Sequence, residues 1–420
     1  MKAKMDRGAS VNRAHSRREF FQVAAAGALV ASAVRRASAV GRNEKNPELR
    51  IERIEVFPVR YPTIGYFKFF EGTPGTPPGR PAVIVKITAS DGTVGWGESV
   101  PIPKWSYETL ESAASTIENY LKPVLLGRDP FDLLGAHEAM NAAIAPSFST
   151  GAPITKSGID MALHDLTGKA CGLSLAQRWG CPSGGKITLS WTLNPRTLDE
   201  TEKLIEEGWK RGYRNFNVKV APDPKFDLEL CRIVNKRVPE GFLWADANGG
   251  YDLATALKVA PKLADIGVPV LEQPLPSNRL TGYRELKKQG ALPIIMDEGV
   301  VSSADLIEFI RLDLLDGVAM KPARCGGLLS AKRQVEILKD AGLMFLGSGL
   351  TDPDVSLAAS LALYGAYGLR FPAALNGPQF LAKSVIKKPF QPVNGQLDVP
   401  TKPGLGIEVD EEKVKALMVG

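Results

Sequence analysis

Histidine is scarce in this chain: it occurs three times in 420 residues. His15 lies in a basic N-terminal segment, and His137 and His164 lie in segments with a helical pattern. Hydrolytic zinc sites take several imidazole ligands, and imidazole is the side chain that most readily exchanges protons near neutral pH. The count therefore excludes a multi-histidine zinc site and argues against histidine-based acid–base catalysis.

An excess of charge is also missing once the N-terminal segment is set apart. The chain has 52 Lys and Arg and 46 Asp and Glu, of which residues 1–39 contain eight and two. Residues 40–420 therefore carry 44 basic and 44 acidic side chains, and their charge predicts neither nucleic acid nor an anionic membrane surface as a partner. No apolar run is long enough for a membrane span.

The N-terminal segment has the features of an export signal. Arg17-Arg18 precedes the apolar stretch FFQVAAAGALVASAV, and Ala37-Ser38-Ala39 gives an A-x-A cleavage site. We predict a twin-arginine signal peptide over residues 1–39, read by the twin-arginine export machinery, and a periplasmic mature protein. A short amphipathic or disordered tail is the alternative. Such proteins fold in the reducing cytoplasm, so the four cysteines, which lack metal-ligand spacing, are expected to be free thiols.

A polar linker, residues 40–48, leads into a segment that alternates like antiparallel strands. Asp91-Gly92 is a strong hairpin turn within it, and helical patterns follow. We interpret residues 49–170 as an α+β capping domain. Its segment 62–80 is rich in Gly, Pro and aromatic residues, which favours a lid over a plain surface loop.

Five ionisable residues recur after the cap at steps of 27, 26, 25 and 24 residues, each at the end of a short apolar run. A period near 25 fits one strand, one helix and two loops, the repeat of a (β/α) barrel. All strands of such a barrel run parallel, so their C-terminal ends meet at one mouth. The spacing predicts a barrel over residues 171–375, with residues 376–420 packing back on the cap. The five residues are Lys219, Asp246, Glu272, Asp297 and Lys321.

The three acids of this series indicate a metal site. Asp246, Glu272 and Asp297 each stand alone at an apolar strand end, where carboxylates are rare unless they are paired or bound to metal. Three converging carboxylates would repel one another without a cation, and an oxygen-only set suits Mg²⁺ or Mn²⁺. Helix capping or surface ion pairs are the alternative.

The two lysines of the series flank the acids. Lys219 precedes them by one strand and Lys321 follows by one strand, so we expect the two to face each other across the metal. A lysine beside a divalent cation has a lowered pKa and can act as a base. A role as a plain ion-pair partner of a metal ligand is the alternative. Paired placement favours acid–base work on a substrate carboxylate held by the metal.

These motifs resemble the enolase superfamily, in its muconate-lactonizing-enzyme subgroup. WADANGGY, LEQP, MDEG and MKPARCGG, with GWGES and KSGIDMALHDLTGKA upstream, carry the resemblance over roughly residues 49–410. It implies an α+β cap over a (β/α)7β modified TIM barrel and one Mg²⁺. It also implies Asp246, Glu272 and Asp297 as metal ligands and Lys219, the second lysine of a K-x-K motif, as one base, with Lys321 as the other.

Some positions depart from the family pattern. The first K-x-K position is Asn217, which we expect to contact substrate. Leu350 stands near the position where the mandelate-racemase subgroup has histidine, and residues 374–376 lack the D-x-D of dipeptide epimerases. Asp352 and Asp354 could face the mouth instead, or cap the following helix. Further candidates for substrate or supporting contacts are Asn248, Glu298, Thr351 and Asn376.

The sequence thus predicts abstraction of a proton alpha to a carboxylate, through an enediolate. Two opposed lysines rank racemisation or epimerisation of an amino-acid derivative or related acid first. Cycloisomerisation of the muconate type or syn-dehydration is the alternative, and a periplasmic binder without turnover is a third hypothesis. The expected partner is a small-molecule carboxylate, and assembly into a homo-oligomer stays open.

Overall fold

The structure, a computed structural model, describes residues 46–70, 78–146 and 150–419. Residues 48–420 form one compact unit, to which the following description applies. The predicted signal peptide, residues 1–39, and most of the linker lie outside the described residues. No helix in the described ranges combines the length and the apolar character that crossing a membrane requires.

The cap begins with an antiparallel sheet in the order β1-β2-β3, formed by Ile51–Tyr61, Arg80–Ala89 and Val94–Ser99. The predicted hairpin turn joins β2 to β3. The Asp91 carboxylate accepts hydrogen bonds from the Thr93 amide (2.9 Å) and hydroxyl (2.9 Å), and Gly92 has φ +82°. Glycine adopts this left-handed conformation without steric cost. The hairpin prediction is therefore confirmed.

Helices complete the cap, and the longest of them packs directly on β3. A Cβ atom on Gly97 would lie 1.9 Å from the carbonyl oxygen of Gly158, so only glycine lets the strand and this helix approach so closely. The glycines of the GWGES motif thus serve close packing. The elements are α2 (Leu110–Thr116), the π-helical turn η1 (Ile117–Leu121), α3 (Lys122–Leu125), α4 (Leu133–Ala143) and α5 (Pro153–Ala170).

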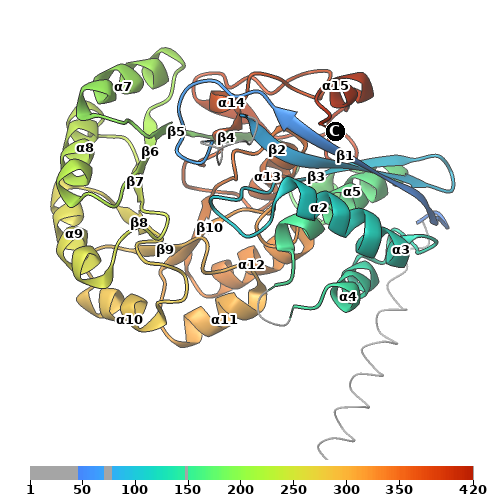
Figure 1. Cartoon of the computed structure of the whole chain (residues 1–420), viewed down its shortest axis with the longest axis horizontal. Helices are drawn as coiled ribbons and strands as arrows, with labels where there is room; N and C mark the ends of the chain where they lie inside the picture. Colours follow the sequence, from blue (N-terminus) through green and yellow to red (C-terminus); the bar gives the residue numbers. More distant parts are fainter. Residues whose placement is uncertain (1–45, 71–77, 147–149, 420) are drawn as a thin grey trace, which may run out of the picture. The chain divides into compact units, whose positions relative to one another are not determined.

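Seven parallel strands, hydrogen-bonded in chain order, make the curled sheet of the barrel (Figure 1). They are β5 (Ser190–Leu193), β6 (Asn215–Lys219), β7 (Leu243–Asp246), β8 (Val270–Glu272), β9 (Ile294–Met296), β10 (Gly317–Met320) and β11 (Met344–Gly347). The connecting helices are α7 (Thr201–Lys210), α8 (Pro224–Arg237), α9 (Leu253–Ile266), α10 (Leu280–Gln289), α11 (Ser303–Arg311), α12 (Leu328–Asp340) and α13 (Asp354–Ala366).

The barrel closes through a short segment after α13. The Ser190 amide donates to the Ala373 carbonyl (2.8 Å), and the Ala374 amide donates to the Gly347 carbonyl (2.9 Å). These bridges join both edges of the sheet, which gives the (β/α)7β barrel. The strand that closes the barrel is thus reduced to isolated bridges, and the chain before β5 adds a short separate strand, β4 (Lys186–Thr188).

Alternation along the strands builds the barrel interior in layers. Trp244, Val270, Ile295, Ala319 and Leu346 form a buried cluster. Successive side chains of a strand point to opposite faces, so the residue two positions later in each strand or strand end faces the same interior, nearer the mouth. That next layer begins at Asp246, two residues after Trp244. The period of two therefore places ionisable groups directly above an apolar layer.

The C-terminal segment returns to the cap. α15 (Glu411–Ala416) packs near β1, the Val419 amide donates to the Pro58 carbonyl (3.0 Å), and Lys86 forms an ion pair with Glu411 (2.6 Å). On its way the segment adds α14 (Gly377–Phe380) and the strand β12 (Gln396–Asp398), which pairs with β4.

Arg80 joins the cap to the barrel. Its guanidinium is fully buried and donates to the carbonyls of Leu350 (3.0 and 2.8 Å), Pro101 (2.6 Å) and Val100 (2.8 Å). Because a buried cation is costly unless its donors are satisfied, this clamp fixes the loop after β11 against the base of β2. Thr351, the next residue in that loop, has φ +53°, a strained conformation that such a fixed loop can maintain.

Candidate active site

The five ionisable residues of the sequence series converge at the mouth of the barrel. Lys219 and Asp246 are partners in the β6–β7 register, and Asp246 and Glu272 are partners in the β7–β8 register. Asp297 and Lys321 follow the last residues of β9 and β10 directly. All three carboxylates are at most 1% exposed and Lys321 is 4% exposed, so the group is removed from bulk water.

Each lysine is paired with one of the carboxylates. Lys219 forms an ion pair with Asp246, and Lys321 forms one with Asp297, while the Lys321 ammonium lies 3.9 Å from Glu272. The Lys219 ammonium lowers the pKa of Asp246 against the opposing effect of burial, and Asp297 raises the pKa of Lys321 against burial. Both lysines thus form the ion pairs that the alternative interpretation expected. These ion pairs hold both ammonium groups beside the acids.

Arg324 is a member of this cluster that sequence reasoning missed. Its guanidinium pairs with Asp297 and donates to the Ala319 carbonyl (2.7 Å), and the residue is 1% exposed. It stands in the loop after β10, in the motif MKPARCGG, outside the period of the strand ends. The sequence feature that could have pointed to Arg324 is a basic residue that stands among small and apolar neighbours in this motif.

The surroundings of the Glu272 carboxylate show whether these residues are suited to bind a cation. Both of its carboxylate oxygens are buried, and neither has a hydrogen-bond partner in the described structure. Burial, followed by repulsion from Asp246, raises the pKa of Glu272 well above its usual range. A buried carboxylate without donors is strongly unfavourable, and a hard divalent cation supplies what it lacks. The acids therefore fit Mg²⁺, although in the described ranges no three His, Cys, Asp or Glu side chains already stand at ligand distances from one point.

Three more predicted residues surround the acids. The Asn248 side chain donates to Glu298 (3.3 Å), and burial followed by repulsion from Asp297 raises the pKa of Glu298 to about 8. Asn217 is 1% exposed and lines the mouth next to Lys219, and neither of its side-chain polar atoms has a partner in the described structure. An amide buried in this way is positioned to contact a ligand.

Aromatic side chains from the cap cover the mouth. Phe67, Phe69 and Trp105 line a cavity of about 20 Å³ with both lysines, and the Lys321 ammonium lies 5.0 Å from the centroid of the Trp105 ring. A cavity of this size holds roughly one or two waters, so a substrate has to displace side chains that line it. The described part of segment 62–80 therefore lies over the mouth, where the lid interpretation put it.

The loop is held to the barrel rim at several points. The Lys68 amide donates to the Asn194 side chain (2.9 Å), the Arg196 guanidinium lies 4.0 Å from the centroid of the Tyr66 ring, and Phe67 stacks on Phe380 with centroids 5.0 Å apart. Burial, followed by the nearby charge of Lys219, lowers the pKa of Lys68 to about 8. Lys68 is a second residue that sequence reasoning did not single out.

The remaining candidates divide between the mouth and a separate cavity. Thr351 and Asn376 line the mouth. The Asp352 carboxylate instead accepts hydrogen bonds from the Leu350 amide (3.0 Å) and the Ser360 hydroxyl (3.0 Å), which fixes the turn before α13. These contacts place the Asp352 carboxylate in the turn before α13, as the capping alternative expects, and a contact of Asp352 with substrate stays a prediction.

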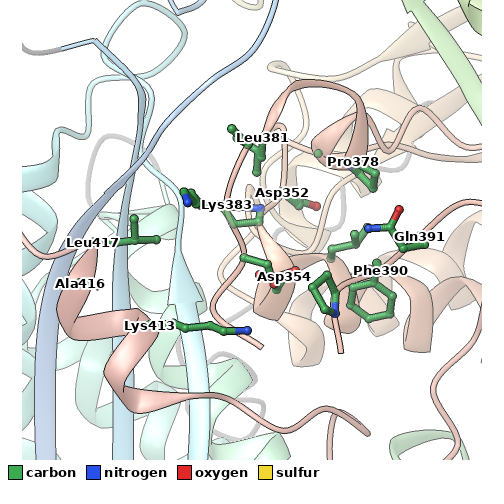
Figure 2. Close-up of a pocket in the computed structure, with 16 residues that line it drawn as sticks. Asp352, Asp354, Pro378, Leu381, Lys383, Phe390, Gln391, Lys413, Ala416 and Leu417 are labelled. Carbon is green, nitrogen blue, oxygen red and sulfur yellow. The ribbon is translucent and has the colours of Figure 1, made fainter. Parts of the chain in front are cut away.

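Asp352 and Asp354 line a larger cavity of about 620 Å³ between the C-terminal segment and α13, which also receives Lys413 from α15 (Figure 2). Asp354 begins α13, and its carboxylate accepts from the Val385 amide (2.8 Å). The cavity does not share the acids or lysines of the mouth.

The histidines and cysteines of the described structure take no part in the mouth chemistry. The Asp160 carboxylate of α5 accepts from His137 (2.8 Å) and from the Leu328 amide at the start of α12 (2.5 Å), so it ties the cap to the barrel. Within the described residues the four cysteines form no disulfide.

Comparison with known proteins agrees with this geometry. The model of the enolase C-terminal domain-like family matches residues 200–413, and that of the mandelate racemase/muconate lactonizing enzyme N-terminal domain matches residues 72–180. The chain is 33% identical to chloromuconate cycloisomerase CbnB of Cupriavidus necator, over 79% of this chain and 90% of that protein. It is 26% identical to the N-succinyl-L-Arg/Lys racemase of Bacillus cereus, over 88% and 98%.

A solved structure shows the same relationship. The muconate lactonizing enzyme from Pseudomonas fluorescens, complexed with muconolactone, superposes with a TM-score of 0.82 at 27% identity, over 89% of this chain and all of that one. The fold, the mouth and the relatives lead to one conclusion: the chain belongs to the enolase superfamily, as an isomerase of the mandelate racemase/muconate lactonizing enzyme family.

Proposed function

We propose that the protein is a Mg²⁺-dependent cycloisomerase that acts on an unsaturated carboxylic acid. The observation that carries its chemistry, proton transfer alpha to a carboxylate, is the pair of lysines that flank three buried carboxylates. The relatives favour a different ranking from that of the sequence analysis: racemisation stood first there, whereas muconate and chloromuconate cycloisomerases, at 29 to 33% identity, support the reaction that stood second.

Asp246, Glu272 and Asp297 would hold the cation. When bound, Mg²⁺ supplies positive charge that stabilises negative charge developing on a substrate carboxylate. The chain's own contribution is positional. Arg324 and Lys321 orient Asp297 from two directions, Lys219 orients Asp246, and the aromatic side chains of the cap exclude water from the group.

The two lysines deliver or remove the proton at the carbon alpha to the carboxylate. Ring closure of an unsaturated diacid forms a carbon–oxygen bond from one carboxylate to the double bond and leaves negative charge alpha to the other. A proton delivered to that carbon completes the reaction, and the reverse reaction removes it. Lys219 and Lys321 both end in an ammonium group at the mouth, so either side of a bound substrate has a donor within the same cavity.

Racemisation is the second candidate, because it needs a base on one face and an acid on the other and the chain supplies both. The 26% identity to an N-succinyl-L-Arg/Lys racemase supports it. The two reactions differ in their product: cycloisomerisation forms a ring, whereas racemisation only inverts a centre.

We expect the mature protein, supplied with 10 mM MgCl₂, to convert cis,cis-muconate to a lactone, and we expect no conversion after exhaustive treatment with EDTA. Loss of the diene absorbance measures this reaction. The same preparation in D₂O, incubated with N-succinyl-L-arginine, tests the second candidate by deuterium incorporation at the alpha carbon. A metal-loaded, folded enzyme that converts neither compound would contradict both assignments.

We also propose export through the twin-arginine pathway, supported by Arg17-Arg18 and Ala37-Ser38-Ala39. We expect Arg17→Lys/Arg18→Lys to retain the full-length chain in the cytoplasm of a host with this pathway, whereas the natural chain reaches the periplasm in a shortened form. Fractionation and mass spectrometry of the N-terminus measure the outcome. Equal export of both forms would show that the arginine pair is not read as a signal.

A further inference from the structure

A third lysine stands over the barrel mouth, and the reaction described above does not use it. Lys68 belongs to the cap loop, between Phe67 and Phe69, which both line the mouth cavity. Its backbone is fixed to the rim by the hydrogen bond to Asn194, and its ammonium lies 5.2 Å from the centroid of the Phe69 ring. The fold thus holds a cationic side chain of the cap beside the substrate cavity.

Lys68 differs from the other two lysines in its partners. Lys219 and Lys321 are each paired with a carboxylate, whereas Lys68 forms no ion pair within the described residues. The charges that act on it are those of Lys219, Asp246 and Glu298 at the mouth and that of Asp227 on α8. A partly buried ammonium without an ion-pair partner is unfavourable, and an anion that arrives with the ligand would offset that cost.

We propose that Lys68 binds a second anionic group of the substrate, so that the enzyme selects dicarboxylates over monocarboxylates. The inference rests on the proposed function, because it assumes that the first carboxylate reacts at the metal and lysine cluster. Asn217, whose buried amide has no partner in the described structure, lies in the same cavity and can share the contact.

Matched substrates test this proposal. cis,cis-Muconate and its monomethyl ester differ in one negative charge, as do N-succinyl-L-arginine and N-acetyl-L-arginine. We expect Lys68→Met to raise KM for the dicarboxylate about 10- to 100-fold, the size of a lost charge-assisted contact, with kcat changed less than about threefold. The monocarboxylate should change less than about twofold. Calorimetric titration of the magnesium-loaded protein with each compound gives the same comparison without turnover.

Two variants control the result. Lys68→Arg keeps the charge and should keep most of the preference for dicarboxylates, and Lys225→Met removes an exposed lysine from the start of α8, at the same end of the barrel, and should change nothing. Equal effects of Lys68→Met on both members of a pair, or no effect on the dicarboxylate, would overturn the role of Lys68. Natural protein that neither converts nor binds any of the four compounds would overturn the proposed function, and the role of Lys68 with it, before any substitution is made.

Discussion

Turnover falls by about 10³-fold or more when Lys219 or Lys321 is replaced by methionine, because positioned acid–base groups contribute about 10² to 10⁴ in rate and each lysine also orients a carboxylate. Steady-state kinetics at saturating MgCl₂ measure the loss. Lys219→Arg and Lys321→Arg sharpen the test. Arginine retains a positive charge beside Asp246 or Asp297 but stays protonated, so it should restore structure without restoring turnover.

Deuterium exchange then separates the two reactions. In a racemase, each single variant keeps one lysine and should still exchange the alpha proton of the enantiomer that this lysine deprotonates. Interconversion of the two enantiomers should be lost. In a cycloisomerase, the lysine that delivers the proton is essential and the other variant retains the stereochemistry of the product. Lys225→Met is the control, since that side chain is exposed. Turnover unchanged in both lysine variants would exclude them from proton transfer.

The part of the site that the sequence predicted is the part that strand geometry repeats. Asp246 follows Trp244 by two residues, and Lys321 follows Ala319 by two, because every strand presents alternate residues to the same interior. A repeat near 25 residues brings such strand ends to one mouth whatever the loops between them do. Spacing alone therefore sufficed to name the five residues that the structure brings together.

The missed residues depend on contacts that no period encodes. Lys68 reaches the mouth through a hydrogen bond to Asn194, 126 positions further along the chain. Arg324 arrives from a loop whose path is fixed by a turn, with Gly326 and Gly327 both at positive φ. Asp352 follows a strand, so the sequence left open whether it faces the mouth or caps the next helix, and in the structure a hydrogen bond from the Leu350 amide holds its carboxylate in the turn. Local polar competition of this kind is decided by tertiary geometry.

Glu272→Gln is expected to separate metal binding from folding more clearly than any other single change. Glutamine has nearly the same shape, but it carries no charge. The folded state disfavours ionised Glu272, because burial and Asp246 raise its pKa, so ionisation above the ordinary pKa of glutamate destabilises the metal-free protein. At pH 8 the metal-free variant should therefore be more stable than the natural protein, with a free energy of unfolding that is higher by about 1 to 3 kcal/mol. Its melting temperature should be higher as well.

The same variant should lose the response to magnesium. A ligand at 100 times its Kd stabilises the folded state by about 2.7 kcal/mol, so the melting temperature of the natural protein rises with MgCl₂, whereas that of Glu272→Gln stays flat. Asp246→Asn is the matched comparison. It also removes a carboxylate, but it leaves the partly buried Lys219 without its partner, so it should lower the melting temperature of the metal-free protein. Two results would show that Glu272 is not a ligand of the cation. One is a Glu272→Gln protein that is less stable than the natural protein without metal, and the other is a variant whose melting temperature still rises fully with MgCl₂.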